Sequence, residues 1–336
     1  MNQNNLNVVR LGAAILVLYG HSFVFLGLPK PLFLSWIPLG PLAVYIFFTI
    51  SGYLITESWD RDPHLLRFFA RRMLRIFPGL IVCILLSILV LGPVFTTLPL
   101  TKYLESHHTW GYLQNIGLYI TYYLPGLFET NRVPNAVNGS LWILPVQFLM
   151  YIIIAMLGCM RLNRWAIAML GLISAIVTVL WAQQTSQMFV VYASDLRQVF
   201  ICGTYFWVGA LFYKFDLKRF FSITSVTFAF ISLISLTSLI GVLSLFAWVL
   251  LPTVVLAFGL SYSPNLNRLT SSGDYSYGIY IYAFPIQQAV VSLYPSMPLG
   301  FYLLVCSALV LACAVLSWNF IEKPSLRLKP RILRVD

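Results

Sequence analysis

Two ionisable residues, Arg10 and His21, stand eleven positions apart in the apolar segment NVVRLGAAILVLYGHSF. At about 100° per residue of an α-helix, eleven steps end about 20° past three full turns, so both side chains lie on one face, about 16.5 Å apart. Ionisable groups inside an apolar span are costly and mark function by default. A histidine alone on an apolar face is usually a hydrogen-bonded core residue, but sharing a face with an arginine inside the span favours a functional pair.

Arginines dominate the segment WDRDPHLLRFFARRMLRIFPG, which follows the second apolar run. Arg67, Arg71 and Arg75 recur at every fourth residue with apolar residues between them, a pattern that predicts an amphipathic helix at the membrane interface. Two functions are open for these residues and Arg72. They hold anionic lipid headgroups, or their forked N–H donors bind the phosphates of a nucleotide-bearing donor.

Four other segments combine small, aromatic and polar residues inside apolar runs. In IFFTISGYLI, Ser51 and Gly52 permit either close helix packing or a local opening of the backbone next to a ligand. NGSLWILPVQFLMY places Trp142 and Gln147 at the start of a run. GDYSYGIYIYAFPIQQ is rich in tyrosine, and SWNFIEKP ends with Glu322 at a predicted interface. For each segment, packing and anchoring are the alternative to a functional role.

The composition excludes a water-soluble globular protein. Hydrophobic residues make up 60% of the 336 residues and charged residues 9%, against roughly 45–50% and 25% in soluble proteins, and the mean hydropathy is +0.84. The continuous apolar runs also exclude a transmembrane β-barrel, whose strands alternate. The net charge of +11 is explained by the distribution of basic residues between the two sides of a membrane, so no nucleic-acid partner is predicted. The five cysteines lie in apolar runs without metal-ligand spacing, which predicts buried thiols and no metal site.

Ten apolar runs of membrane length predict an all-α, polytopic membrane protein. Their even number places both termini on one side. Assigning that side to the cytoplasm leaves Lys30, Lys102, Arg132 and Arg197 outside and Arg10 within the first span, so sixteen of the 21 basic residues lie inside. This asymmetry is a strong positive-inside signal. The expected spans are 7–28, 39–57, 77–99, 141–160, 165–182, 198–213, 221–240, 243–260, 275–294 and 299–320.

The remaining organisation predicts a single membrane domain over residues 1–336. There is no repeat of roughly 20–50 residues and no Gly/Ser-rich linker, and no appended soluble domain is expected. The first run lacks the features of a cleaved signal, so it is predicted to remain as an anchor. The longest outer segment, 100–140, is rich in aromatic residues that form either an interfacial belt or a stacking platform for a sugar ring, and its Asn138-Gly139-Ser140 sequence predicts a turn.

Taken in order, these segments resemble the acyltransferase-3 family of membrane O-acyltransferases, which includes enzymes that acetylate O-antigen, exopolysaccharide, peptidoglycan and nodulation factors. The resemblance rests on a series of motifs rather than on one. They are the Arg-x10-His signature at Arg10 and His21, FFxxSG at Phe47 to Gly52, RxxR at Arg72 to Arg75 before Pro78, SLW at Ser140 to Trp142, SYGIY at Ser276 to Tyr280, and the terminal block at Ser317-Trp318 and Ile321 to Pro324.

The resemblance implies an enzyme of the bacterial cytoplasmic (inner) membrane that moves an acyl group, by default acetyl, from cytoplasmic acyl-coenzyme A to a hydroxyl of a carbohydrate or glycolipid acceptor. Acetyl-coenzyme A is then a co-substrate, and no permanently bound cofactor is expected. The implied site residues form three groups: His21, Arg10, Ser51 and Gln147 for catalysis; Arg71, Arg72 and Arg75 for the donor; and Phe48, Gly52, Trp142, Tyr277, Tyr280 and Glu322 for the acceptor or as structural motif residues.

A physical scheme accompanies these roles. Coenzyme A cannot cross the membrane because its phosphates are costly to desolvate, but its thin pantetheine arm can thread into the protein. His21 then acts as general base or transient acyl carrier, and Arg10 lines the donor tunnel. Ser51 or nearby backbone N–H groups stabilise the oxyanion. The outer aromatic residues and Trp142 shape the acceptor site.

The chain departs from the family pattern at two positions. Gln147 stands where the fourth block commonly has Glu, and Ala283 stands where the SYGIY block is often followed by His. Glutamine lacks the negative charge and the proton acceptor of glutamate. Two other functions therefore stay open: a noncatalytic member of the family, and a transporter or flippase of a lipid-linked glycan or small anion. No paired broken helices or intramembrane carboxylate ladder favour transport.

Overall fold

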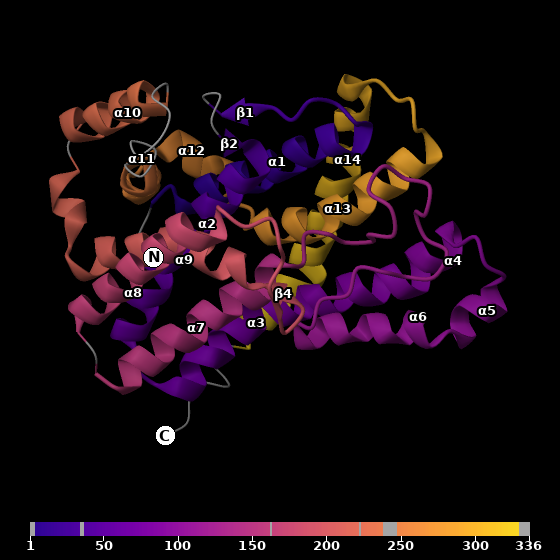
Figure 1. The fold of residues 1–336 in the computed structure, drawn as a ribbon, viewed down its shortest axis with the longest axis horizontal. Coiled ribbons are helices and arrows are strands. Elements are labelled where there is room, and N and C mark those ends of the chain that lie inside the picture. Colours follow the sequence, from indigo (N-terminus) through magenta and orange to yellow (C-terminus); the bar gives the residue numbers. More distant parts are fainter. Residues whose placement is uncertain (1–3, 34–36, 162, 222, 238–246, 329–336) are drawn as a thin grey trace. The chain divides into compact units, whose positions relative to one another are not determined.

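The structure, a computed structural model, describes residues 4–33, 37–161, 163–221, 223–237 and 247–328, and it is predominantly α-helical over these ranges (Figure 1). The helices are α1 (Leu6–Leu26), α2 (Leu39–Arg61), α3 (Leu65–Leu86), α4 (Gly92–Phe95), α5 (Leu100–Glu105), α6 (His107–Gly111), α7 (Ile143–Cys159), α8 (Arg164–Val177), α9 (Leu196–Lys214), α10 (Ile223–Thr237), α11 (Ala247–Leu260), α12 (Pro264–Leu269), α13 (Ser276–Leu293), α14 (Leu299–Ser317) and α15 (Lys323–Arg327).

Short irregular elements connect these helices. Two antiparallel pairs of two-residue strands join β1 (Leu32–Phe33) to β2 (Ile37–Pro38) and β3 (Val190–Val191) to β4 (Ser194–Asp195). Single π-helical turns extend three of the helices at their C-terminal ends. These turns are η1 (Ser87–Leu91) after α3, η3 (Thr178–Ala182) after α8 and η6 (Trp318–Glu322) after α14.

Five helical stretches among the described residues are long and apolar enough to cross a membrane, judged by length and composition: Leu6–Leu26, Leu39–Arg61, Leu65–Phe95, Arg164–Ala182 and Leu299–Arg327. Each of the ten expected spans overlaps a helix, but several of these helices are shorter than a full crossing, so the number ten stays a prediction. Parts of the spans expected at 221–240 and 243–260 lie outside the described residues, as do Lys329, Arg331 and Arg334.

The arginine segment differs from its prediction. An interfacial helix and a separate span from residue 77 were expected, but α3 runs without a break from Leu65 to Leu86 and contains Pro78. The proline removes one backbone donor, yet a helix with tertiary partners tolerates this loss. Arg67, Arg71, Arg72 and Arg75 are therefore on the same helix as the apolar residues that follow them.

The prediction of buried thiols is wrong for Cys159, which lies exposed at the end of α7. Cys83, Cys202 and Cys306 are buried, Cys313 is half-buried, and all five thiols are free. An apolar run predicts burial on average but does not say which helix face meets protein, and in a membrane span the exposed face is also apolar.

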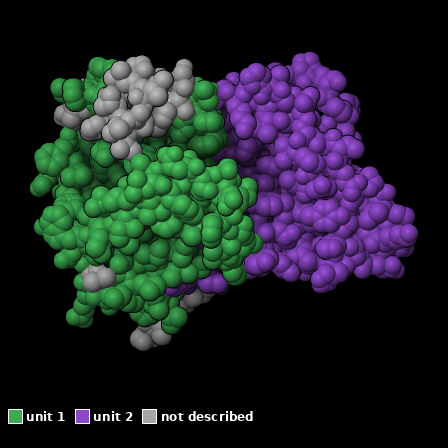
Figure 2. All heavy atoms as spheres, viewed as in Figure 1, with its two compact units in different colours: residues 1–13, 32–68, 146–273 green, residues 14–31, 69–145, 274–336 purple. Residues whose placement is uncertain are grey.

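The chain packs into two compact units (Figure 2). Unit 1 consists of residues 1–13, 32–68 and 146–273, and unit 2 consists of residues 14–31, 69–145 and 274–336. Boundaries between the units fall within α1, α3 and α7. The single domain expected over the whole chain stays a prediction.

In unit 1, α2 and α9 pack backbone against backbone. A Cβ atom on Gly52 would overlap the carbonyl oxygen of Phe206, and one on Gly209 would overlap the carbonyl oxygen of Thr49. The rings of Tyr45 and Tyr205 stack beside this contact with centroids 4.2 Å apart. Because α2 is unbroken at Gly52, the glycine serves close packing rather than a local opening of the backbone.

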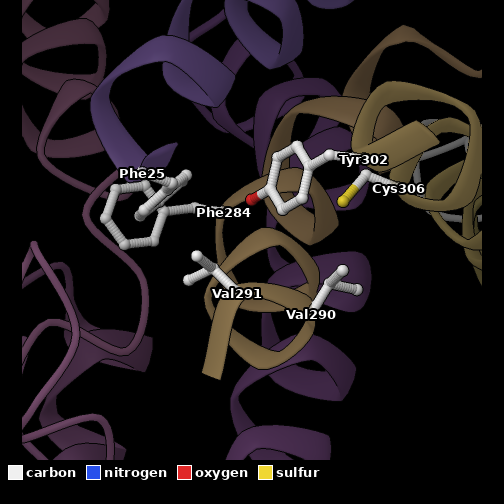
Figure 3. Packing of buried hydrophobic residues seen from close by; sticks show 6 residues of the cluster. All are labelled: Phe25, Phe284, Val290, Val291, Tyr302 and Cys306. Carbon is white, nitrogen blue, oxygen red and sulfur yellow. The ribbon is translucent and has the colours of Figure 1, made fainter. Parts of the chain in front are cut away.

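Unit 2 is built on the packing of α13 against α14. Its buried cluster consists of Phe25, Phe284, Val290, Val291, Tyr302 and Cys306 (Figure 3). Gly278 lets the two helices approach, since a Cβ atom there would lie 2.9 Å from Cα of Ala314. The cluster therefore joins the end of α1 to both C-terminal helices.

The last turn of α1 lies in unit 2 and ends in a defined geometry. Gly27 has φ +68°, and the N–H of Leu28 donates to the carbonyl of Phe23 at 2.8 Å. This arrangement is the Schellman motif, in which a glycine in the left-handed region satisfies the last carbonyls of a helix. The helix end that carries His21 is thus fixed by its own sequence.

The outer segment 100–140 folds into short helices and turns. Tyr103 is buried and its hydroxyl donates to the carbonyl of Ile88 at 2.9 Å. Burial raises the pKa of Tyr103 to about 12. Trp110, Tyr119 and Tyr123 are exposed, and the belt or platform predicted from the sequence stays a prediction.

Replacing Gly209 with alanine is expected to destabilise the protein by about 1–3 kcal/mol, because the new methyl group pushes α9 away from the backbone of α2. The midpoint of thermal unfolding in detergent measures this effect. Gly12→Ala is the matched control, since a Cβ atom there meets no described atom within 4 Å and alanine favours the helix. An equal decrease in both variants would contradict the close contact of α2 and α9.

Candidate active site

His21 lies among aromatic rings near the end of α1. Its imidazole packs edge-on against Phe25 and Phe284, with ring centroids 6.2 and 5.4 Å away. Its Nδ1 atom is buried and has no hydrogen-bond partner in the part of the chain that the structure describes. Because a buried polar atom without a partner costs free energy, this nitrogen is a candidate for contact with a substrate.

Gln287 of α13 holds the turn of α1 that carries His21. Its Nε2 atom donates to the carbonyl of Leu18 at 2.9 Å and to Oγ of Ser22 at 2.8 Å. The hydroxyl of Tyr302 on α14 donates to the carbonyl of Gln287 at 2.8 Å. Since Leu18 and Ser22 flank His21 in the helix, these bonds fix the position of the imidazole relative to α13.

The turn predicted at residues 138–140 is present, and it is buried and bound to α13. Asn138 donates from Nδ2 to the carbonyl of Ile281 at 2.8 Å and accepts the N–H of Ser140 at 3.1 Å. The hydroxyl of Tyr280 donates to the carbonyl of Ser140 at 2.7 Å. The SLW and SYGIY motifs are therefore joined by side-chain bonds to the backbone.

Arg75 of α3 sits between two carboxylates. Its guanidinium contacts Asp274 at 2.6 Å and Glu322 at 3.7 Å, and it lies 6.0 Å from the ring of Tyr277 and 5.8 Å from that of Trp318. The side chain of Glu322 is only 2% exposed. The structure thus brings together Arg75, Tyr277 and Glu322, which come from three distant motifs, and it holds Arg75 within the protein.

Tyr277 also fixes α13 to α3 directly. Its hydroxyl donates to the carbonyl of Ile76 at 2.7 Å. Ser317 adds a bond from its hydroxyl to Oε1 of Glu322 at 3.0 Å. The tyrosine and the glutamate of these motifs therefore have structural partners in the described residues.

The other arginines of α3 differ in their surroundings. Arg67 forms an ion pair with Asp62 at 2.6 Å, and both side chains are about one third exposed. Arg71 and Arg72, in unit 2, are half-buried. Of the three residues expected to bind the donor, Arg75 is the one described above between Asp274 and Glu322, and the role of all three in donor binding stays a prediction.

In unit 1, the structure brings Gln147 to Ser51. The Nε2 atom of Gln147 donates to Oγ of Ser51 at 2.9 Å. Ser51 therefore accepts from the amide and keeps its own O–H as a donor. A glutamate at position 147 would accept that hydrogen instead, so the amide changes the direction of the bond.

The remaining expected site residues occupy separate places. Phe48 is fully buried in α2, whereas Arg10 in α1 is half-buried, and both belong to unit 1. Trp142 is half-buried in the turn before α7, in unit 2. Among the described residues there is no group of three or more His, Cys, Asp or Glu side chains that could hold a metal ion.

Sequence reasoning missed four residues that organise the site: Asp274, Asn138, Ser22 and Gln287. Each is a polar residue within or next to an apolar run, and Asn138, Ser22 and Gln287 are at most 1% exposed. Two adjacent glutamines in the run IYAFPIQQ were a signal for buried hydrogen bonds, since amides in a span need partners. Their partners could not be identified without the fold.

Comparisons with known proteins agree with these motifs. Residues 3–318 match the family model for the acyltransferase-3 domain, described as an acyltransferase domain. The chain is 29% identical to the O-acetyl transferase of Shigella phage Sf6 over 328 residues, which covers 95% of each chain. It is 27% identical to nodulation protein 10 of Rhizobium leguminosarum bv. viciae, over 99% of this chain and 95% of the relative.

A third relative matches over a shorter region. The peptidoglycan O-acetyltransferase OatA of Listeria monocytogenes is 26% identical over 178 residues, which is 48% of this chain and 28% of the relative. No solved structure matches the chain. The similarity thus extends over nearly the whole chain and includes proteins named for O-acetyl transfer.

Replacing Arg75 with methionine is expected to destabilise the protein by about 3–5 kcal/mol, because it leaves two largely buried carboxylates, Asp274 and Glu322, without their shared cation. Adding Asp274→Asn and Glu322→Gln to the variant should restore much of the loss. Thermal unfolding of the purified variants measures both effects.

Arg67→Met is the control, because Arg67 lies on the same helix and its pair with Asp62 is more exposed than the contacts of Arg75 and therefore contributes less. A stable Arg75→Met variant, or a triple variant as unstable as the single one, would contradict the structural role of Arg75.

Proposed function

The chain belongs to the acyltransferase-3 family, a family of multi-pass membrane acyltransferases, and from this membership we propose that it transfers an acetyl group from acetyl-coenzyme A to a hydroxyl of a carbohydrate or glycolipid. The names of the relatives from the Shigella phage and from Listeria support acetyl as the transferred group. The proposal therefore names acetyl-coenzyme A as the donor and a carbohydrate or glycolipid as the class of acceptor.

One observation carries the assignment of the reacting group. His21 presents a buried Nδ1 atom without a described partner, at a turn of α1 that Gln287 holds in place. An imidazole in a fixed position with one nitrogen available meets the geometric need of a general base. Among the expected catalytic residues, His21 is therefore our choice for the base.

The proposed step is a direct acyl transfer. The acceptor oxygen attacks the carbonyl carbon of the thioester, a C–O bond forms, and the C–S bond breaks. The hydroxyl proton passes to Nδ1 of His21 and then to the sulfur of the departing coenzyme A, which restores the neutral imidazole. Oxygen, sulfur and proton are thus balanced without any additional reactant.

We assign the donor phosphates to Arg71 and Arg72, since forked guanidinium groups suit phosphate. Arg75 positions α3 through its carboxylate partners, and Arg10 lines the path of the pantetheine arm. The charge distribution supports ten spans with both termini in the cytoplasm of a bacterium, where acyl-coenzyme A is made, and an acceptor on the outer side of the inner membrane.

From its motif in the sequence alone, Ser51 is our candidate for the donor to the oxyanion that forms on the thioester oxygen. Its hydroxyl hydrogen is available because Gln147 donates to its oxygen. A positioned donor of this kind contributes about 10²–10³ in rate in other acyl-transfer enzymes. Gln147 acts through Ser51 and is a positioning residue.

His21→Ala is expected to lower acetyl transfer by at least about 10²–10⁴-fold, because the acceptor proton loses its base. The measurement uses the purified protein in detergent with radiolabelled acetyl-coenzyme A and follows transfer to a glycolipid acceptor or slow hydrolysis of the donor. Binding of acetyl-coenzyme A should change little.

The control for this variant is His64→Ala, which removes an exposed histidine from the loop before α3. Both variants should elute as the wild-type protein does in size-exclusion chromatography. Full turnover by a folded His21→Ala protein would exclude His21 as the base.

Gln147→Glu is expected to lower turnover, because a carboxylate at this position accepts the hydroxyl hydrogen of Ser51 and removes the donor to the oxyanion. Gln147→Met tests the same bond without adding charge and should have a smaller effect. Faster turnover by the glutamate variant would instead mean that the missing carboxylate limits this chain, and it would overturn the proposed role of Gln147.

A further inference from the structure

The side-chain oxygen of Gln287 is the feature of unit 2 that the reaction scheme leaves unexplained. Gln287 is 0% exposed, and its Oε1 atom has no hydrogen-bond partner among the residues that the structure describes. Its Nε2 atom, in contrast, makes two bonds to α1. The amide is therefore held in one orientation, with its acceptor directed away from these bonds.

The neighbourhood of this oxygen coincides with that of His21. Phe284 precedes Gln287 by three residues on α13, so both side chains lie on the same side of the helix. The ring of Phe284 packs against the imidazole of His21, and Nε2 of Gln287 bonds to residues on either side of His21. Two buried polar atoms without described partners, Oε1 and Nδ1, thus belong to side chains that pack around one aromatic ring.

A third such atom comes from the turn before α7. Ser140 is 1% exposed, and its Oγ atom also has no partner in the described part of the chain, although its backbone N–H and carbonyl are both bonded. Gly139, the preceding residue, lies against the ring of Phe284, where a Cβ atom would be 2.5 Å from a ring carbon. Buried polar atoms are rarely left without partners, and here three of them belong to residues that contact the ring of Phe284 or stand next to such a contact, which indicates a ligand site.

We propose that Gln287 is a substrate-binding residue, whose Oε1 accepts a hydrogen bond from an O–H or N–H group of the molecule that reacts at His21. This inference rests on the proposed acyl transfer. An amide carbonyl accepts hydrogen bonds and carries no charge, so it recognises a neutral donor rather than a phosphate. Two parts of the substrates have this chemistry: a hydroxyl next to the one acylated on the acceptor, and an amide N–H of pantetheine on the donor.

The orientation of the amide makes the contact selective. Nε2 is bound to Leu18 and Ser22, so rotating the amide to present N–H groups to a ligand would break two buried bonds. A ligand that offers only acceptors at this point is therefore rejected. A ligand lacking the donor leaves the carbonyl without a partner and binds more weakly.

The test compares Gln287→Met with Ser22→Ala in the full-length protein purified in detergent. The first variant removes Oε1 and Nε2 at similar side-chain volume, whereas the second removes one partner of Nε2 and leaves Oε1 in place. For each variant, KM and kcat are measured for acetyl-coenzyme A in donor hydrolysis and for a glycolipid fraction of bacterial membranes in transfer. Titration calorimetry with acetyl-coenzyme A gives a binding readout separate from turnover.

Gln287→Met should raise one KM about tenfold, because a bond made in the bound state is lost, and it should also lower kcat, because the two bonds that hold the turn of His21 are lost with Nε2. Ser22→Ala should leave both KM values within about threefold of wild type. A raised KM and weaker calorimetric binding for acetyl-coenzyme A identify the pantetheine amide as the ligand group. A raised KM for the glycolipid alone identifies an acceptor hydroxyl.

The inference is overturned if Gln287→Met leaves both KM values unchanged, if only kcat falls, or if Ser22→Ala reproduces the whole effect, since Gln287 then acts on the structure of α1 alone. These results are distinct from failure of the proposed function. That failure appears as a wild-type protein with no turnover or as a fully active His21→Ala variant, whatever the behaviour of the Gln287 variant.

Discussion

The cost of burying polar groups inside apolar helices is the constraint on which unit 2 depends. Water is excluded from this interior, so each buried N–H, O–H or amide needs a partner within the protein. Tyr277, Tyr280, Asn138 and Gln287 meet this need by donating to backbone carbonyls of other segments. Each bond fixes the position of two segments that are far apart in the sequence, and together they hold α1, α3 and the turn before α7 against α13.

This constraint also separates structural from functional residues. Arg75 and Glu322 stand in motifs, but they complete an ion-pair network with Asp274 and contribute to the packing of α3 against the C-terminal helices. His21, Gln287 and Ser140 each retain one buried polar atom without a partner among the described residues. Tyr112 and Trp318 also carry such an atom, but His21 and Gly139, which precedes Ser140, contact the ring of Phe284, and Gln287 lies one helical turn from it. Their position is therefore the place where we expect a substrate to contribute the missing bonds.

The helical fold was predictable because it follows from local properties. Apolar runs predict the helices. Gly27 allows α1 to end, and Gly52 and Gly278 allow α2 and α13 to pack closely against their neighbours. The boundary of α3 was not predictable, because the proline that usually ends a helix is tolerated when neighbouring helices support it. The exposed position of Cys159 was missed for a related reason, since hydrophobicity does not distinguish a face that meets protein from one that does not.

The site was predictable in part. The sequence identified His21 by the cost of an ionisable group in a span, and it identified Ser51 and Gln147 from motifs without foreseeing that they bond to each other. It placed Arg75 on one helix face with the other arginines but could not show the carboxylates opposite it, and the role of Arg75 in donor binding stays a prediction. Gln287 and Ser22 were missed because an amide and a hydroxyl carry no charge. Their role in holding α1 against α13 depends on hydrogen-bond partners that only the fold reveals.

The central claim is that the imidazole of His21 takes the acceptor proton, and a protein with His21 as its only histidine tests it most directly. The chain contains four histidines, and His64, His107 and His108 are all exposed. The measurement is the rate of acetyl transfer from radiolabelled acetyl-coenzyme A by the purified triple variant His64→Gln, His107→Gln and His108→Gln, beside the same variant with His21→Gln added. The account predicts transfer near the wild-type rate in the first and its loss in the second. Equal transfer by both proteins, each shown to be folded, would contradict the account.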